Sequence, residues 1–372
     1  MQTGNTIGRH VVRQTLSDDK LKRFVFAGLL AIVVSIQLVM VGRYTISISN
    51  VNWSVSNLSA LPHPVQTSLN LTGYDAAETA FRTVGGRTCF VEGLDERNGT
   101  SATAGGCRCK TDWFGTACSV PGFISRSWTP WSKDSLQVRW RPRRVVNAFP
   151  FNIEFDMLEL RFAELASVVD VFLILESNYT AYGTPKPLHL LERMRNGTYS
   201  NVIDRVVYVL LDYFPADGYK DGWVADALIR NYLGTHGLRR LDGLRPDDLL
   251  VLNDADELPR RELISFLKWH DGYSEPVTIA YRWSVFGFFW GVPTSSGVPK
   301  TQRISAVVTI AMVTYVFRYR IYEIRSASRF INQRQHAFDV QVLVVGLAFL
   351  ANVNSRSCSI YAVARPSAVC RL

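Results

Sequence analysis

Apolar and polar positions follow two different periods along residues 145–293, and they predict helices and strands in turn. Residues 154–165, EFDMLELRFAEL, carry an apolar residue at every third or fourth position, which predicts an amphipathic helix. Residues 222–238, GWVADALIRNYLGTHGL, predict a second helix that stops at Gly234 or Gly237. Near-continuous apolar runs, typical of buried strands, occupy residues 168–178, 205–214 and 247–257. This alternation predicts an α/β domain whose mostly parallel sheet has helices on both faces.

The apolar run 249–252 leads directly into the acidic stretch 253–257, NDADE. Ligands of parallel sheets bind at the carboxyl ends of the strands, and Asp254 and Asp256 fall at such an end. Carboxylates are hard oxygen ligands that suit Mn²⁺ or Mg²⁺ and leave positions free for phosphate oxygens. We therefore predict that both aspartates bind a divalent ion that bridges a diphosphate. The alternative is an acidic cap on a helix that starts near Pro259, and carboxylates tied to arginines would argue against a metal.

Residues 24–42 form an uncharged apolar run of 19 residues, long enough to span a bilayer as a helix. A buried core helix and a cleaved signal peptide are the alternatives. The basic residues of segment 1–23 favour a cytoplasmic tail there, which places the rest of the chain in the lumen. Residues 43–75 are poor in charge and rich in Ser, Asn and Thr, and they predict a flexible glycosylated stem.

Possible N-glycosylation sites support this topology, because all six N-x-S/T sequons follow the predicted anchor. They begin at Asn52, Asn57, Asn70, Asn98, Asn178 and Asn196. All six cysteines also follow the anchor, as expected of a lumenal body in an oxidising compartment.

The formal charge of +9 is concentrated at the two ends of the chain. Residues 294–372 carry ten Lys/Arg and two Asp/Glu (+8), and residues 1–23 carry five and two (+3), which leaves −2 for residues 24–293. A body without excess positive charge argues against nucleic acid as a partner.

Four cysteines, Cys89, Cys107, Cys109 and Cys118, fall within segment 76–121. The end of this segment, CRCKTDWFGTAC, resembles the C-terminal half of an EGF-like module. That resemblance implies disulfides between Cys89 and Cys107 and between Cys109 and Cys118. A zinc site is the alternative, but the cluster contains no histidine. The partners of the two remaining cysteines, at positions 358 and 370, stay open.

Several longer stretches resemble glycosyltransferase family 17, the β-1,4-mannosyl-glycoprotein 4-β-N-acetylglucosaminyltransferases. They include NAFPFNIEFDMLELRFAEL (147–165), LLDYFPADGYKDGWVADALIRNYL (210–233) and LRPDDLLVLNDADELPRRELISFLKWHDGYSEP (244–276). The resemblance runs in the same order over roughly residues 75–293. It implies a GT-A-like fold and a single-pass type II membrane protein of the Golgi.

The resemblance also implies the reaction. The expected donor is UDP-N-acetylglucosamine, and the expected acceptor is the core β-mannose of an N-glycan on a glycoprotein. The β-1,4 product from an α-linked donor implies an inverting displacement, which needs a general base and help for the departing UDP. Mn²⁺ is favoured over Mg²⁺ as the cofactor. The alternatives are an inactive truncated relative and a membrane-anchored, EGF-like binding glycoprotein.

Further site residues are assigned through the same resemblance. Glu176 is predicted to face the nucleotide or the acceptor, unless it is a capped or paired surface carboxylate. Arg230, with Trp223 and Asp226, is predicted to contact sugar or phosphate, although helix packing and an i, i+4 ion pair explain the same pattern. The weak candidates for the base are Asp271 and Glu275. An aromatic cluster is either a sugar platform or core, and comprises Trp283, Phe286, Phe288, Phe289 and Trp290.

The resemblance stops after about Pro293, so we expect a glycosyltransferase domain at residues 145–293 and an atypical tail at 294–372. The tail has no tryptophan and two acidic residues. Its apolar runs are too short to span a bilayer. Family members continue with different sequence after this position. If the acceptor site or the general base lies in that continuation, we expect it to be missing from this chain.

Overall fold

The computed structural model describes residues 64–74, 80–95, 102–103, 106–127, 136–273, 275–284, 295, 297, 301–330 and 337–345. The chain divides into two compact units, residues 1–59 and 60–372, and all described residues belong to the second. The predicted cytoplasmic tail, the membrane anchor and the start of the stem lie outside the described residues. Among the residues that are described, no helix has the length and apolar character needed to cross a bilayer.

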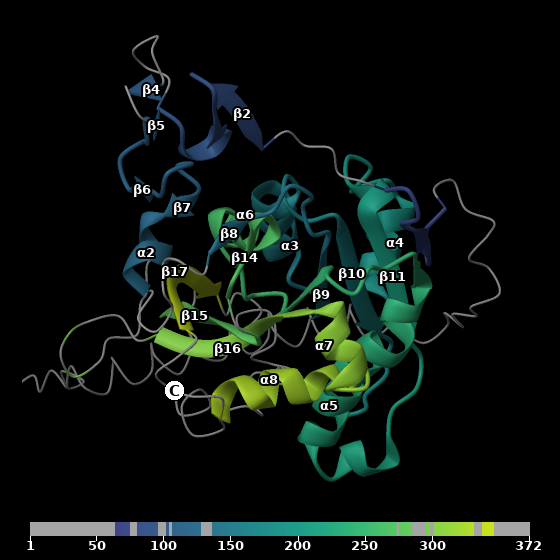
Figure 1. Ribbon diagram of the computed structural model, residues 1–372. Coiled ribbons are helices and arrows are strands. Elements are labelled where there is room, and N and C mark those ends of the chain that lie inside the picture. Colours follow the sequence, from purple (N-terminus) through teal and green to yellow (C-terminus); the bar gives the residue numbers. More distant parts are fainter. Residues whose placement is uncertain are drawn as a thin grey trace, which may run out of the picture. The chain divides into compact units, whose positions relative to one another are not determined.

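A seven-stranded mixed sheet lies at the centre of the described part, in the order β11-β10-β9-β13-β16-β15-β17 (Figure 1). The neighbours β11, β10, β9 and β13 are parallel, which confirms the parallel sheet predicted from their apolar runs. The next strand, β16, is antiparallel to both β13 and β15, and β17 is parallel to β15. The strands are β9 (Val145–Phe151), β10 (Val171–Ser177), β11 (Val206–Leu211), β13 (Leu249–Leu252), β15 (Val277–Ser284), β16 (Thr301–Thr309) and β17 (Ala337–Val345).

Helices cover both faces of this sheet, as predicted. Figure 1 shows α3 and α6 on one side and α5 and α8 on the other. Along β9, Val146 belongs to a core cluster with Ile229 of α5 and Ile324 of α8, while the ring of Phe149 contacts Arg161 of α3 on the opposite face. The helices are α2 (Gly122–Ser127), α3 (Phe155–Leu165), α4 (His189–Arg195), α5 (Gly222–Tyr232), α6 (Arg261–Trp269), α7 (Ile310–Tyr315) and α8 (Ile321–Phe330).

The expected end of the domain at residue 293 is wrong, because the sheet continues into the predicted tail. Val307 of β16 lies opposite Val251 on one side and Val277 on the other. Without β16, β13 would be an edge strand with unpaired backbone groups. The sequence SAVVTI, residues 305–310, is rich in β-branched residues and suits a buried strand, whereas the basic composition of the surrounding tail hides this local signal.

The predicted flexible stem is also wrong over residues 64–74, which pack against the body. A short strand β1 (Leu69–Asn70) pairs in parallel with β12 (Leu241–Asp242). Leu71 is 1% exposed and belongs to the main core cluster. Its carbonyl oxygen accepts a hydrogen bond of 2.6 Å from the Arg144 guanidinium. One buried leucine and a backbone pairing are therefore enough to fix this otherwise polar segment.

Two disulfides cross-link the cysteine-rich segment as the resemblance to an EGF-like module implies. Cys89 is bonded to Cys107 and Cys109 to Cys118, which confirms the predicted pairs. The described residues of this segment form three small antiparallel pairs: β2 (Phe81–Val84) with β3 (Arg87–Phe90), β4 (Ala102–Thr103) with β5 (Gly106–Cys107), and β6 (Trp113–Phe114) with β7 (Val120–Pro121). Because these strands are only two to four residues long, the cross-links contribute much of the stability of this part.

The disulfide-bonded segment contacts the body through the end of α6. Phe81 packs edge-on against Trp269 with the ring centroids 5.3 Å apart. The ring of His270, at the start of β14 (His270–Asp271), is buried between two partners. Its Nε2 lies 2.9 Å from the hydroxyl of Ser119, and its Nδ1 lies 2.9 Å from the carbonyl oxygen of Phe266. Burial disfavours the imidazolium form and lowers the pKa of His270 to about 4.

This buried histidine predicts a pH-dependent stability. The folded pKa lies below the ordinary histidine value of about 6.5, so the unfolded chain binds the proton more tightly. The free energy of unfolding should fall by up to about 3 kcal/mol between pH 6.5 and 4 and be independent of this group above pH 7. Urea unfolding at a series of pH values should show a flatter dependence in His270→Asn. His236→Asn, which changes an exposed histidine, should keep the wild-type dependence; equal slopes for His270→Asn and wild type would contradict the assignment.

Candidate active site

The acidic stretch lies where predicted, at the carboxyl end of β13. All four residues of β13 are buried, and so are the side chains that follow. Asp254 is 2% exposed, Asp256 is 3% exposed and Glu257 is 1% exposed. Three carboxyl groups in one buried loop are costly to ionise unless cations or hydrogen-bond donors surround them. The loop therefore depends on what the neighbouring elements place beside it.

Two arginines hold the carboxylate of Asp254. The guanidinium of Arg230, on α5, lies 2.5 Å from its Oδ1, and that of Arg325, on α8, lies 2.7 Å from its Oδ2. Burial alone would raise the pKa of Asp254, but the two guanidinium groups outweigh it and hold the pKa below its usual value. Asp254 is therefore ionised, and each of its two carboxylate oxygens contacts one arginine side chain.

Arg230 also forms the ion pair with Asp226, one helical turn earlier on α5. Both side chains are buried, and the guanidinium links Asp226 to Asp254. The i, i+4 spacing predicted this pair as one of two alternatives, and the structure shows it. The predicted contact of Arg230 with sugar or phosphate stays a prediction. Trp223, near the start of the same helix, donates its backbone N–H to the side chain of Asp221.

Glu257 receives its partners from the C-terminal part of the chain. Arg325 binds it with two nitrogens, at 2.5 Å and 3.0 Å. The hydroxyl of Ser305, on β16, donates to the same carboxylate at 2.6 Å, and so does the backbone N–H of Asp254 at 2.9 Å. A bidentate guanidinium contact is among the stronger polar interactions in proteins. Ser305 and Arg325 were not predicted from the sequence, because the composition of residues 294–372 indicates an atypical tail.

Arg161 of α3 is a third arginine at the loop, and it was not predicted from the sequence either. It is fully buried and donates to the backbone carbonyls of Asp254, Ala255 and Glu257 at 2.7 Å to 3.0 Å. It also donates to the side-chain oxygens of Asn147 and Asn253. A usable signal was present, since Arg161 interrupts the apolar face of its helix three residues after Leu158. A charged residue in that position requires buried partners.

A divalent ion does not fit Asp254 in this arrangement. Mn²⁺ and Mg²⁺ need carboxylate oxygens at roughly 2.0–2.3 Å, and both oxygens of Asp254 already face guanidinium nitrogens. Asp256 lies on the same loop and is buried. Within the described part of the chain, no group of three or more His, Cys, Asp and Glu side chains is arranged to hold a metal. The metal assignment of Asp254 and Asp256 stays a prediction, and it requires Arg230 or Arg325 to move.

Glu176 is not a surface carboxylate, which corrects one of the two expectations for it. It is fully buried at the end of β10, where its oxygens accept the backbone N–H groups of Leu190 and Leu191 at 2.9 Å and 3.1 Å. The hydroxyl of Tyr208 donates to it at 2.9 Å. Burial raises the pKa of Glu176. These contacts cap the first turn of α4, and the predicted role toward a nucleotide or acceptor stays untested.

The two candidate bases lie at the wrong edge of the sheet. Glu275 accepts the backbone N–H of Thr309 at 2.7 Å, and Thr309 pairs with Leu249, the first residue of β13. Asp271 binds Arg139, which also binds Asp247, just before β13. Asp254 follows the other end of this strand, roughly 10 Å further along at about 3.3 Å per residue. Neither Asp271 nor Glu275 can therefore act beside Asp254 in this arrangement.

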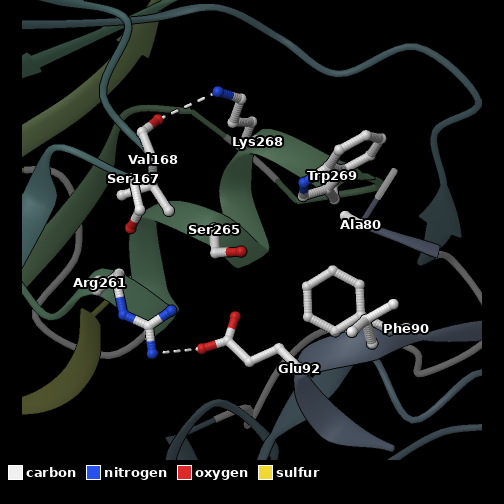
Figure 2. A pocket seen from close by; sticks show the side chains of 10 residues that line it. Ala80, Phe90, Glu92, Ser167, Val168, Arg261, Ser265, Lys268 and Trp269 are labelled. Atoms are coloured by element: carbon white, nitrogen blue, oxygen red, sulfur yellow. Dashed lines mark hydrogen bonds and ion pairs between the residues drawn. The ribbon is translucent and has the colours of Figure 1, made fainter. Parts of the chain in front are cut away.

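A cavity of about 520 Å³ lies elsewhere, between the disulfide-bonded segment and α6 (Figure 2). Figure 2 shows Glu92 directed toward Arg261, with Phe90 and Trp269 nearby and Ser265 between the ion pair and the tryptophan. The nearest oxygen of Glu92 is 2.7 Å from the Arg261 guanidinium. Neither Asp254 nor Asp256 lines this cavity.

The remaining predicted residues divide between described and undescribed parts. Asn70 and Asn196 are exposed, and Asn178 is partly buried. Glycosylation at these three positions stays a prediction. The other predicted sequons, at positions 52, 57 and 98, lie outside the described residues, as do the aromatic positions 286, 288, 289 and 290 and the side chain of Trp283.

The central part of the chain is similar to one family of known proteins. Residues 130–314 match the family model described as glycosyltransferase family 17. Over 187 residues the chain is 47% identical to the β-1,4-mannosyl-glycoprotein 4-β-N-acetylglucosaminyltransferase of Rattus norvegicus and to that of Homo sapiens. These matches cover 50% of this chain and 35% of each relative, so the chain matches about a third of the relatives' length.

A solved structure shows a weaker likeness. The mannosyltransferase PcManGT from Pyrobaculum calidifontis superposes with a TM-score of 0.31 and 15% identity, over 59% of this chain and 61% of that chain. A TM-score this low supports no inference about the site.

The contacts of Arg161 predict a large loss of stability in Arg161→Met. The methionine fills similar space but removes a buried cationic donor that three carbonyls and two amide oxygens share. The free energy of unfolding should fall by about 3–5 kcal/mol, measured by urea denaturation. Arg239→Met, at an exposed position, should change it by less than about 0.5 kcal/mol. If both variants unfold at the wild-type midpoint, Arg161 does not hold the acidic loop.

Proposed function

Because residues 130–314 form a glycosyltransferase family 17 domain, we propose that the protein transfers N-acetylglucosamine from UDP-N-acetylglucosamine to the core β-mannose of N-glycans. The transfer creates a β-1,4 linkage with inversion at the sugar. The names of the curated relatives support this donor sugar and this linkage. The family match at residues 130–314 contains the four parallel strands of the sheet. The match covers about a third of each relative's length, so the activity of the whole relatives is proposed for this chain.

The observation that carries the proposal is the carboxylate loop at the end of β13. It follows a buried strand inside the matched region, at the edge of a parallel sheet where nucleotides and other ligands bind. A purely structural loop has no need of so much buried charge, since burial of each ionised carboxylate must be offset by buried partners.

The chemistry proposed is a single displacement at the donor sugar. The acceptor hydroxyl attacks, a base takes its proton, and UDP leaves with increasing negative charge. The sequence predicts a divalent cation, with Mn²⁺ favoured over Mg²⁺. In the structure, the oxygens of Asp254 contact guanidinium groups of Arg230 and Arg325. The base must come from a group other than Asp271 and Glu275, because both lie at the opposite edge of the sheet.

The proposed location is the Golgi membrane, with residues 24–42 as a single type II anchor and the body in the lumen. Two observations support it. The structure contains two disulfides, which persist in oxidising compartments such as the secretory pathway. The basic residues before position 24 favour a cytoplasmic amino terminus. Glycoproteins that carry N-glycans would be the partners of the enzyme in this compartment.

Transfer of radiolabelled N-acetylglucosamine to a biantennary N-glycan tests the proposal. The full chain should transfer label from UDP-N-acetylglucosamine with Mn²⁺ present, and a chelator should reduce the rate. Asp256→Asn should reduce it by about 100-fold or more, because the aspartate is proposed to contact the donor complex. Asp217→Asn, at a highly exposed aspartate paired with Lys220, is the matched control and should retain the wild-type rate.

Two results would contradict the proposal. One is a folded wild-type chain that transfers no label with any divalent ion offered. The other is a transfer rate that Asp256→Asn leaves unchanged. An EGF-like binding glycoprotein predicts the first result, with binding to its partner unaffected by the substitution.

A further inference from the structure

The cavity of about 520 Å³ lies apart from the acidic loop, which contributes none of its lining (Figure 2). Its volume falls within the roughly 300–1,000 Å³ typical of small-molecule sites. The disulfide-bonded segment forms one wall and contributes Phe90 and Glu92. Helix α6 forms the other wall and contributes Arg261, Ser265 and Trp269. The family match begins at residue 130, so the first wall comes from a segment outside it.

Contacts behind the cavity hold its two walls in place. Phe81 of the disulfide-bonded segment packs against the rings of Phe90 and Trp269, with centroids 5.1 Å and 5.3 Å apart. The ammonium of Lys110 donates to the backbone carbonyl of Glu92 at 2.7 Å, which fixes the chain where Glu92 enters the cavity. The walls are therefore set by contacts within the protein, as is usual for ligand sites.

The side chain of Ser265 indicates that the cavity suits a polar ligand. The residue is 5% exposed. Figure 2 shows its hydroxyl directed into the cavity, between the Glu92–Arg261 ion pair and the ring of Trp269. Within the described part of the chain this hydroxyl has no hydrogen-bond partner. Buried polar groups are normally hydrogen-bonded, and a serine inside a helix often uses the carbonyl one turn earlier. The Ser265 hydroxyl is thus available to a group bound in the cavity.

The neighbouring ion pair can form further hydrogen bonds. The guanidinium of Arg261 lies 2.7 Å from the carboxylate of Glu92, and the two side chains are 37% and 22% exposed. A guanidinium has five N–H donors and a carboxylate has about four acceptor positions, so one contact uses only part of each group. Figure 2 shows these polar groups facing the rings of Phe90 and Trp269 across the cavity.

The charged groups of the lining favour a neutral ligand, because each has a partner of opposite sign. Glu92 pairs with Arg261, and the ammonium of Lys268 lies 3.0 Å from the carboxylate of Asp170. An anion would lie beside Glu92 and a cation beside Arg261, so neither gains from a net charge. A fully apolar ligand would cover the polar groups without replacing their hydrogen bonds to water. A neutral molecule with many hydroxyl groups and one apolar face, which is the chemistry of a sugar, satisfies both walls.

We propose that this cavity binds a neutral sugar unit of the acceptor glycan. Ser265, Glu92 and Arg261 form hydrogen bonds with its hydroxyl groups. Phe90 and Trp269 contact its C–H face. The disulfide-bonded segment thereby takes part in substrate binding as well as in stability.

The position of the cavity suits a branched acceptor. Arg261 follows Glu257 of the acidic loop by four residues, so their Cα atoms are at most about 14 Å apart. A biantennary N-glycan carries sugars beyond the one that accepts the transfer. One of them can occupy the cavity while the accepting sugar lies at the proposed transfer site. The choice of an acceptor glycan rests on the proposed function, whereas the preference for a neutral sugar rests on the lining alone.

Saturation-transfer difference nuclear magnetic resonance tests the inference by measuring how a free biantennary N-glycan binds the full chain in detergent. No sugar nucleotide or metal is added, and the chain's own N-glycans are removed enzymatically beforehand. The wild type should bind the glycan. Ser265→Leu removes the hydroxyl and fills part of the cavity, so its Kd should be about 10-fold higher or more. Ser200→Leu, at an exposed serine, is the matched control and should bind as the wild type does.

Glu92→Ala gives a second test that leaves α6 unchanged. It removes the charged acceptor and opens the cavity, and Kd should rise about 5-fold or more. Glu192→Ala, at an exposed glutamate of α4, is its control and should keep the wild-type Kd. Excess inorganic phosphate should not displace the glycan, because the cations of the lining are paired with carboxylates. If Ser265→Leu does not fold, Ser265→Ala replaces it and should still weaken binding.

A wild type that binds no glycan would overturn the inference, as would folded cavity variants with the wild-type Kd or displacement of the glycan by phosphate. Sugar transfer is not part of this experiment. A chain that binds the glycan through this cavity but transfers no sugar contradicts the proposed function alone. A chain that transfers sugar and binds the glycan equally well in every variant contradicts this inference alone.

Discussion

Neutralisation of the acidic loop after β13 is the interaction on which the rest of the site depends. Three carboxyl side chains lie within four residues of each other, and all are nearly inaccessible to water. Ionised groups in such surroundings cost several kcal/mol each unless charge and hydrogen bonds compensate. Arg161, Arg230 and Arg325 supply the compensation from three different helices. The loop therefore has its shape because α3, α5 and α8 converge on it.

This constraint ties the C-terminal part of the chain to the rest of the domain. The segment that adds β16 to the middle of the sheet continues through α7 into α8, which delivers Arg325. Ser305 of β16 donates to the same glutamate that Arg325 binds. Sheet completion and charge compensation thus come from one stretch of sequence. Removal of that stretch would leave β13 as an edge strand and leave Glu257 without its cation.

The sheet also separates its polar groups between two edges. The carboxyl edge of β13 carries the acidic loop, whereas the amino edge carries ion pairs that hold the backbone in place. Arg144 and Asp248 form a buried pair there, and Asp271 contacts both Arg139 and Arg143. These charged groups at the amino edge already bind one another in ion pairs that stabilise the fold. Chemistry proposed for this domain therefore concentrates at the opposite edge, next to Asp254 and Asp256.

Local patterns in the sequence determined much of the architecture. Apolar runs predicted β10, β11 and β13, helical spacing predicted α3 and α5, and the cysteine pattern, through its resemblance to a known module, predicted both disulfides. The acidic residues after β13 also stood out, because their position depends on the few residues around them. Signals of this kind lie within one element or one short loop, so they can be read without knowing the fold.

Tertiary structure alone decided which groups meet. Asp254 and Arg325 are 71 positions apart in the chain, and no local pattern specifies that contact. Asp271 and Glu275 follow the acidic loop closely in sequence, yet α6 and the turn after it return them to the other edge of the sheet. The average composition of segments 43–75 and 294–372 predicted a stem and a tail. Packing and strand pairing depend on a few buried side chains, and those lie within residues 64–74 and 301–309. Charge compensation and strand pairing join residues that are far apart in the chain. Local sequence therefore predicts the helices and strands better than it predicts which of them are in contact.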